Sequence, residues 1–235
     1  LNPYQPLGRG SVGKPTPGVD LKISDQGEIL MKGPFILSKY YKNEEITKET
    51  LKNGWLHTGD KGHIDNDGFL YVSDIDNHRV VRWDPSAKEG IIVAGGNGNG
   101  NQSNQLSYPM GIVLDENKNL YVADTYNHRV QLWTPEAKNG VTILSADDID
   151  FESFNFFTGI SVDKKNRLYV SDYEKRQVVE FDMTSNSIKI VAGGNQVGSK
   201  PNQFSDPFQI ISKTDDFILV ADAKNHRIQK WKLNQ

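Results

Sequence analysis

Four segments of the chain align with one another without a gap, and this repetition constrains the fold more than any other feature. They begin at residues 70, 120, 168 and 218, so successive starts are 50, 48 and 50 residues apart. The segments read LYVSDIDNHRVVRW, LYVADTYNHRVQLW, LYVSDYEKRQVVEF and ILVADAKNHRIQKW. A period of this length is typical of propellers and solenoids, in which each unit covers a face of the next.

Each period contains about four short runs with the pattern of β-strands. In the second period they are residues 111–115, 120–124, 128–133 and 141–144, separated by turn residues such as Asn, Asp, Gly and Pro. β-branched and aromatic residues dominate the runs, apolar and polar positions alternate, and no helical spacing occurs. Four antiparallel strands repeated at constant spacing predict a propeller blade. We therefore expect a mainly β protein.

A turn triplet identifies the repeat more closely. It occurs as Asn77-His78-Arg79, Asn127-His128-Arg129 and Asn225-His226-Arg227, whereas the third unit has Lys175-Arg176-Gln177. With the preceding Val-[Ser/Ala]-Asp and the following Trp, the units resemble NHL repeats over about residues 62–235. The resemblance implies a propeller of about four blades, at about residues 62–96, 109–145, 157–194 and 207–235, the last without its outer strand. NHL propellers commonly have six blades.

Two interpretations of the triplet compete. In the first, the three His form a metal or catalytic set. In the second, the triplet is a structural hairpin turn between the second and third strands. In the second, Asn adopts the left-handed conformation that it tolerates, and Asp124 pairs with Arg129 across the turn. Equivalent turns lie on separate blades and hold their imidazoles apart, so we favour the structural role and predict that His128→Ala costs stability, not activity.

The residues before the repeats carry a different set of motifs. They read GSVGKP (10–15), GEILMKGP (27–34), YYKN (40–43), GWLHTGD (54–60) and GHIDNDGFLY (62–71). Their order and spacing resemble the adenylate-forming acyl-CoA synthetases over about residues 8–73, a C-terminal fragment of the adenylation core. The family implies that the carboxylate of Asp60 contacts both ribose hydroxyls of a nucleotide. Thr58, Gly59 and Asp60 are therefore our candidate, vestigial cofactor-binding residues; without the flanking motifs the three would be only a turn with a capping residue.

The rest of the ligase machinery is missing from the sequence given. Residues 8–11 (GRGS) are not the Ser/Thr/Gly-rich, Lys-ended phosphate loop, and an adenine- and Mg²⁺-binding segment would precede Leu1. From Ser73 the sequence continues as an NHL blade in place of a hinge and a domain with a catalytic Lys. Each of these parts often contributes several kcal/mol to phosphoryl chemistry. We predict an inactive remnant at residues 1–61, no catalytic residues and no cofactor.

The join between the two parts satisfies both patterns. Residues 62–74 read as strand, turn and strand, and Asp65 precedes Leu70 by five residues, as Asp115 precedes Leu120 in the second unit. We hypothesise that this hairpin supplies the first two strands of blade one. Before it, residues 43–53 predict a short helix with Asn43 as N-cap, and residues 19–23 and 28–31 read as strands.

An open arc of blades would leave two blade faces bare. At roughly 1.5–3 kcal/mol per buried apolar side chain, each bare face forgoes a stabilisation that rivals that of a whole domain. A compact four-blade ring, the N-terminal segment acting as a plug or extra strands, or self-association with another chain would cover them. We favour the first two together.

Composition excludes several function classes. The chain of 235 residues has no Cys, which excludes disulfides, thiolate metal sites and a Cys nucleophile. Its net charge of −3 argues against nucleic acid, and no apolar run of membrane-spanning length occurs. Localisation stays open, and the start at Leu1 suggests a fragment or a processed chain.

The leading functional hypothesis is a non-catalytic binding or scaffold module. Its inter-blade loops, residues 95–109, 145–157 and 193–207, would bind a protein, peptide or carbohydrate, because Asn, Gln, Gly and Ser suit adaptable hydrogen bonding. The alternatives are a fragment of an AMP-forming acyl-CoA ligase and a propeller-type lyase or lactonase. Asp147, Asp148, Asp150 and Glu152 offer carboxylates for Ca²⁺, but we expect a solvated run and assign no metal.

Overall fold

A computed structural model describes residues 19–24, 28–34, 36, 44–64, 68–84, 87, 89–149, 156–214 and 216–233. The chain divides into two compact units, each described by itself. The first unit comprises Leu1–Asp74 and Val81–Ile92, and the second comprises Ile75–Val80 and Val93–Gln235. Within the described residues, no helix has the length and apolarity needed to cross a lipid bilayer.

Most strands of a seven-stranded sheet belong to the first unit; the sheet has the order β1-β2-β4-β5-β6-β7, with β3 paired to β4. Ile29, Val72, Val81 and Trp83 form the buried core of this unit. The elements of this part of the chain are β1 (Asp20–Ile23), β2 (Glu28–Lys32), α1 (Glu44–Thr50), β3 (Leu51–Lys52), β4 (Trp55–Ile64), β5 (Leu70–Asp74), β6 (Arg79–Trp83) and β7 (Ile91–Gly95). The predicted strands at 19–23 and 28–31 and the predicted short helix are confirmed, while Asn43, the expected N-cap, lies outside the described residues.

Strand β4 crosses the predicted boundary between the remnant and the repeats. It pairs with β2 through Leu56 and His57, and with β5 through Lys61 to Ile64. The hairpin at residues 62–74 therefore belongs to the same sheet as β6 and β7, as the hypothesis of a shared hairpin requires.

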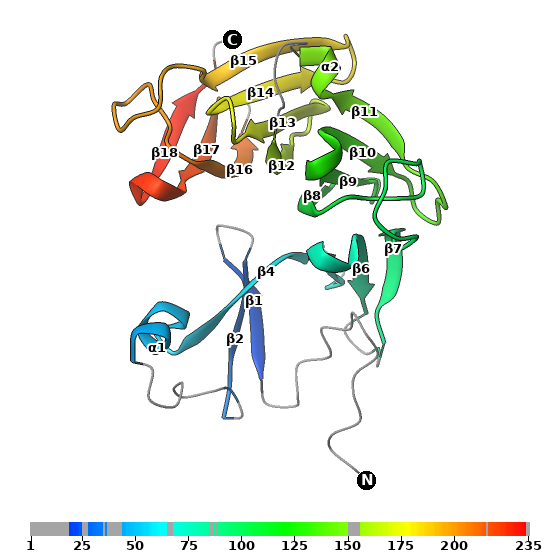
Figure 1. The fold of residues 1–235 in the computed structure, drawn as a ribbon, viewed down its shortest axis with the longest axis vertical. Helices are drawn as coiled ribbons and strands as arrows, with labels where there is room; N and C mark the ends of the chain where they lie inside the picture. Colours follow the sequence, from blue (N-terminus) through cyan, green and yellow to red (C-terminus); the bar gives the residue numbers. More distant parts are fainter. Residues whose placement is uncertain are drawn as a thin grey trace. The chain divides into compact units, whose positions relative to one another are not determined.

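The second unit contains three sheets in sequence order, each a meander of antiparallel strands. In Figure 1 they fan out one after another, with β8, β12 and β16 at the inner ends. The strands are β8 (Pro109–Leu114), β9 (Leu120–Asp124), β10 (Arg129–Trp133), β11 (Val141–Ser145), β12 (Phe157–Val162), β13 (Arg167–Asp172), β14 (Gln177–Asp182), β15 (Ser187–Gly193), β16 (Pro207–Thr214), β17 (Phe217–Asp222) and β18 (Arg227–Lys232). The short helices are η1 (Ile75–Asn77), η2 (Thr125–Asn127), α2 (Ala146–Ile149) and η3 (Ala223–Asn225).

The period-2 pattern of the repeats produces these strands. Along β10, Val130 pairs with Ala123 and Leu132 with Tyr121, and the indole of Trp133 donates to Gln131 Oε1 at 3.1 Å on the same face. Gln131, on the same strand, is fully buried although it is polar. Its hydrogen bond offsets part of the cost of removing the amide from water.

Adjacent blades approach each other closely at glycines in their inner strands. A Cβ at Gly111 would lie 2.5 Å from the Thr158 carbonyl oxygen, and one at Gly159 would lie 2.0 Å from that of Phe208. The buried apolar residues of neighbouring sheets then form shared clusters, such as Val130 and Leu144 with Ile160 and Leu168. Burial between blades is thus the driving force that a single blade lacks.

The chain is mainly β and of the propeller type, and the fourth repeat has three strands, as predicted. The blade count differs from the predicted value of about four. The strands form five blade-sized groups, because the seven-stranded sheet contains enough strands for two and three smaller sheets follow it. The sequence missed this because only the repeat-bearing part of that sheet carries the repeat motif.

Candidate functional site

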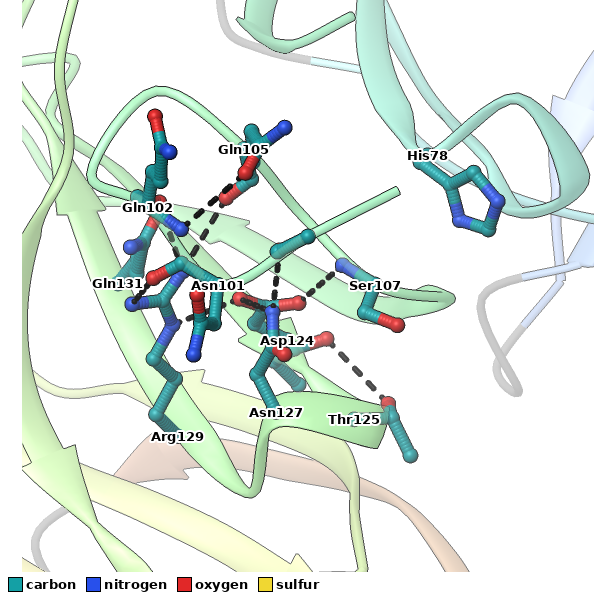
Figure 2. Close-up of polar contacts among 12 residues, drawn as sticks. His78, Asn101, Gln102, Gln105, Ser107, Asp124, Thr125, Asn127, Arg129 and Gln131 are labelled. Atoms are coloured by element: carbon teal, nitrogen blue, oxygen red, sulfur yellow. Dashed lines mark hydrogen bonds and ion pairs between the residues drawn. The ribbon is translucent and has the colours of Figure 1, made fainter. Parts of the chain in front are cut away.

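The repeated turn of the second blade encloses a buried carboxylate. Asp124, at the end of β9, is 0% exposed and accepts hydrogen bonds from Ser107 N at 2.6 Å, Asn127 Nδ2 at 2.8 Å and Arg129 Nε at 2.7 Å. Figure 2 shows the three donors converging on it. The predicted pairing of Asp124 with Arg129 across the turn is confirmed.

The other end of the Arg129 guanidinium ties down the preceding inter-blade loop. Its two terminal nitrogens donate to the carbonyl oxygens of Asn101 at 2.8 Å and of Gln102 and Gln105 at 3.1 Å (Figure 2). Asn127 Nδ2 also donates to Gly100 O at 2.8 Å. Since Asp124 fixes the guanidinium, the loop is bound to the blade by one charge-assisted network.

The fourth blade repeats this network with different loop residues. Asp222 accepts from Asn225 Nδ2 at 2.8 Å and from Arg227 Nε at 2.9 Å. Arg227 donates in turn to the carbonyls of Ser199, Lys200 and Gln203. We call each set of Asp, Asn and Arg with its bound carbonyls a loop lock. Two of the three loops predicted to bind adaptably are therefore held in place by loop locks.

The third blade has no such Arg, and its carboxylate behaves differently. Asp172 accepts from Lys175 N at 3.1 Å and from Gln177 Nε2 at 3.4 Å. Burial raises its pKa to about 6, because these bonds and the Lys175 charge only partly offset desolvation. Burial also raises the pKa of Asp124. At Asp222 burial acts in the same direction but is outweighed, chiefly by the bond from Asn225, and the pKa lies below its ordinary value.

The histidines of the triplet occupy the left-handed position that we expected for Asn. His78, His128 and His226 have φ values of 53°, 53° and 51°, and Arg176 follows them at 52°. The Asn lies one residue earlier, at the end of the short helix, where its amide serves the loop lock. The prediction of a left-handed Asn was therefore wrong, because the Asn side chain makes its hydrogen bonds to Asp and to the loop from the end of the short helix, one residue before the left-handed position.

Each of two histidines packs on an aromatic ring that precedes the next inner strand. His78 contacts Tyr108 with ring centres 4.7 Å apart, and His128 contacts Phe156 at 5.3 Å. His78 Nδ1 also accepts from Tyr108 N at 3.2 Å. No cluster of three or more metal-ligating side chains occurs within the described part of the chain. These contacts give the two imidazoles a packing role.

Tyr126 joins these pairs into a continuous aromatic row. Its ring lies 4.6 Å from that of Tyr108 and 5.3 Å from that of Phe156, and its side chain is 52% exposed. The row, formed by His78, Tyr108, Tyr126, His128 and Phe156, lies at the edge of the blades where the second and third strands turn. The sequence analysis missed it because Tyr108 and Phe156 lie outside the repeated core, although both directly precede an inner strand.

The remaining predicted loop, residues 145–157, contains the run of carboxylates in the sequence. Asp148 Oδ2 accepts from Ser145 N at 2.7 Å and from Ser145 Oγ at 2.8 Å, so this carboxylate stabilises the start of α2. Asp150 and Glu152 lie outside the described residues.

The ligase-like motif lies on β4. Thr58 Oγ1 donates to Ile29 O at 2.8 Å, which fixes its hydroxyl to β2. Gly59 and Asp60 follow in the same strand, rather than in the turn expected from the three residues alone. Their role as ribose contacts remains a prediction.

Comparison with known proteins finds matches to NHL repeats and, separately, to acyl-CoA ligases. Residues 106–132 match the family model of the NHL repeat, which confirms the predicted repeat. Over 96 residues, 41% of the chain, it is 40% identical to the long-chain-fatty-acid–CoA ligase FadD15 of Mycobacterium tuberculosis. Over 95 residues it is 42% identical to the 2-succinylbenzoate–CoA ligase of Oceanobacillus iheyensis. The chain spans only 14% and 20% of these two ligases, so the likeness to ligases is partial.

Solved structures share the fold at low identity. A Bacteroides thetaiotaomicron protein of unknown function matches 91% of the chain and 58% of its own, with a TM-score of 0.60 at 17% identity. A protein from a nidogen/laminin complex matches 92% and 90%, with a TM-score of 0.53 at 15% identity. A streptogramin B lyase matches 96% and 72%, with a TM-score of 0.51 at 11% identity. At these identities the matches establish the propeller fold and nothing beyond it.

Proposed function

We propose that the chain is a non-catalytic binding module that docks a protein or peptide on the aromatic row. The observation that carries the proposal is the exposed ring of Tyr126, supported on both sides by Tyr108 and Phe156. Tyrosine is enriched among the residues that dominate binding energy, because a rigid ring with a polar tip buries a large area at low entropic cost.

The loop locks favour the same conclusion. By holding the loop at residues 96–106 against its blade, Arg129 presents a surface beside the row that is ordered before a partner arrives. A preorganised surface loses less conformational entropy on binding. One fold neighbour was solved in a complex of two proteins, nidogen and laminin, which is consistent with docking on this type of scaffold.

The second candidate function is that of a ligase fragment, favoured by the 40% identity to an acyl-CoA ligase over 96 residues. It would make Asp60 a ribose contact. The lyase alternative has less support, since His78 and His128 pack against separate aromatic side chains.

The test is selection of a phage-displayed random peptide library on the whole chain, followed by surface plasmon resonance of the enriched peptides. Tyr126→Ala should weaken their binding by about thirtyfold, the effect of losing a hot-spot side chain of about 2 kcal/mol. Ile190→Ala is the matched control, because Ile190 is 57% exposed but lies on an outer strand. Peptides that bind the wild-type chain and Tyr126→Ala equally would refute the proposal.

A further inference from the structure

A cavity of about 560 Å³ lies between the second and third blades. It is bordered by the turn from β8 to β9, with Asn117 and Asn119, and by turns of the third blade, with Asn166 and Asn186. In the register of β8 and β9, Pro109 pairs with Asp124 at the hairpin end and Leu114 with Leu120 at the other. The cavity therefore lies at the edge of the blades opposite the aromatic row.

Equivalent positions of the second and third blades differ at this cavity. Four residues after the Asp of the first turn, the second blade has Asn119 and the third has Arg167. The residue paired with the Tyr of the second strand is Leu132 in the second blade and Glu180 in the third. Arg167 bonds Asp163 at 2.7 Å, and Glu180 is buried against Lys189 at 2.9 Å. In the second blade a short amide and an aliphatic side chain replace these long charged groups.

The polar groups of the cavity are amides and hydroxyls apart from one carboxylate, whose oxygens are occupied by neutral donors. Asp115 accepts four hydrogen bonds, from Asn117 N and Asn119 N at 2.9 Å, Asn119 Nδ2 at 2.8 Å and Tyr121 OH at 3.2 Å. Burial, with the Asp115 charge beside it, raises the pKa of Tyr121 to about 12, so the phenol keeps its proton. Among the described residues that line the cavity, Asp115 is the one that carries a charge, and none of them is a cation that could pair with an anionic ligand.

The lining combines these amides with apolar side chains. Leu132, Ile143, Phe181 and Met183 supply the apolar part of the lining. Amide groups offer donors and acceptors together, which matches neighbouring hydroxyls, and apolar side chains match the C–H face of a pyranose ring. The volume lies within the range of about 300–1,000 Å³ that is usual for small-molecule sites. We infer that this cavity binds a neutral mono- or disaccharide, at a site separate from the peptide surface.

The test is a titration of the whole chain with maltose, cellobiose, lactose and N-acetylglucosamine, followed by amide chemical shifts in NMR spectra. Saturable shifts at Asn117, Asn119 and Asn166 with one or more of these sugars are expected. Glucuronate, whose carboxylate would meet the Asp115 charge without a cation to pair with, should bind at least tenfold more weakly than the best neutral sugar.

Two variants keep the inference open to refutation. The double variant Asn119→Arg/Leu132→Glu copies the third blade into the second and should lower affinity at least tenfold, with folding checked by circular dichroism. Asn166→Gly, which suits the left-handed φ of 59° at this exposed turn, should fold normally and lower affinity severalfold. The inference is overturned if no neutral sugar gives saturable shifts, if glucuronate binds as well as the best neutral sugar, or if both variants bind like the wild-type chain.

Discussion

Replacing Arg129 by Met should separate the contribution of the loop lock from that of the blade core. The substitution keeps an apolar stem of similar length but leaves Asp124, which is 0% exposed, without its cation. Breaking a buried ion pair on one side costs about 3–5 kcal/mol. The three loop carbonyls lose their donors as well, but they lie near solvent and regain hydrogen bonds from water, so we expect a total loss within that range.

Urea denaturation measures this loss, and hydrogen–deuterium exchange locates it. Exchange should accelerate at residues 97–105 and stay unchanged at residues 195–203, the equivalent loop held by Arg227. Gln177→Ala is the matched control: its amide contacts Asp172 at 3.4 Å, so it should cost about 1 kcal/mol or less. A loss below about 1 kcal/mol for Arg129→Met, or equal acceleration in both loops, would refute the reasoning.

Three further predictions follow from the blades. Burial raises the pKa of Asp172 from 3.8 to about 6, so the folded chain binds this proton more tightly than the unfolded chain. The free energy of unfolding should therefore fall as the pH rises from about 4 through 6. Asp172→Asn should remove up to about 3 kcal/mol of the difference between urea titrations at pH 4 and pH 7. Gly159→Ala places a Cβ 2.0 Å from a backbone carbonyl oxygen and should lower the unfolding free energy by about 3 kcal/mol or more. The control Gly98→Ala, with φ of 82° and no neighbour within 4 Å, should lower it by about 1 kcal/mol. Similar losses for the two variants would contradict close packing of the inner strands. His128→Ala should lower the melting temperature by several degrees, because it removes the ring that packs on Phe156; an unchanged melting temperature would contradict this packing role.

The strands of the blades could be predicted from sequence because their signal is local. Alternation along residues 128–133 specifies both a strand and its buried face, and a repeated pattern makes the prediction independent of any single run. The partnership of Asp124 and Arg129 was predictable for the same reason, since hairpin geometry brings the two residues together.

The loop locks were not predictable, because half of each lock is backbone. The side chain of Arg129 finds carbonyl oxygens, which leave no mark in the sequence. One indirect signal exists. The blades with Arg129 and Arg227 follow loops that begin Gly-Gly-Asn and end Asn-Gln, then Leu or Phe, then Ser, whereas the blade with Gln177 follows a different loop. The Arg and this loop sequence occur together or are both absent, because in the structure the Arg side chain holds the loop.

The most direct test of a binding module without adenylation chemistry is isothermal titration of the whole chain with Mg·ATP, repeated with Asp60→Ala. We expect no saturable heat from either protein. Saturable ATP binding by the wild-type chain that disappears in Asp60→Ala would contradict a module without adenylation chemistry and make the ligase-like segment a working nucleotide site.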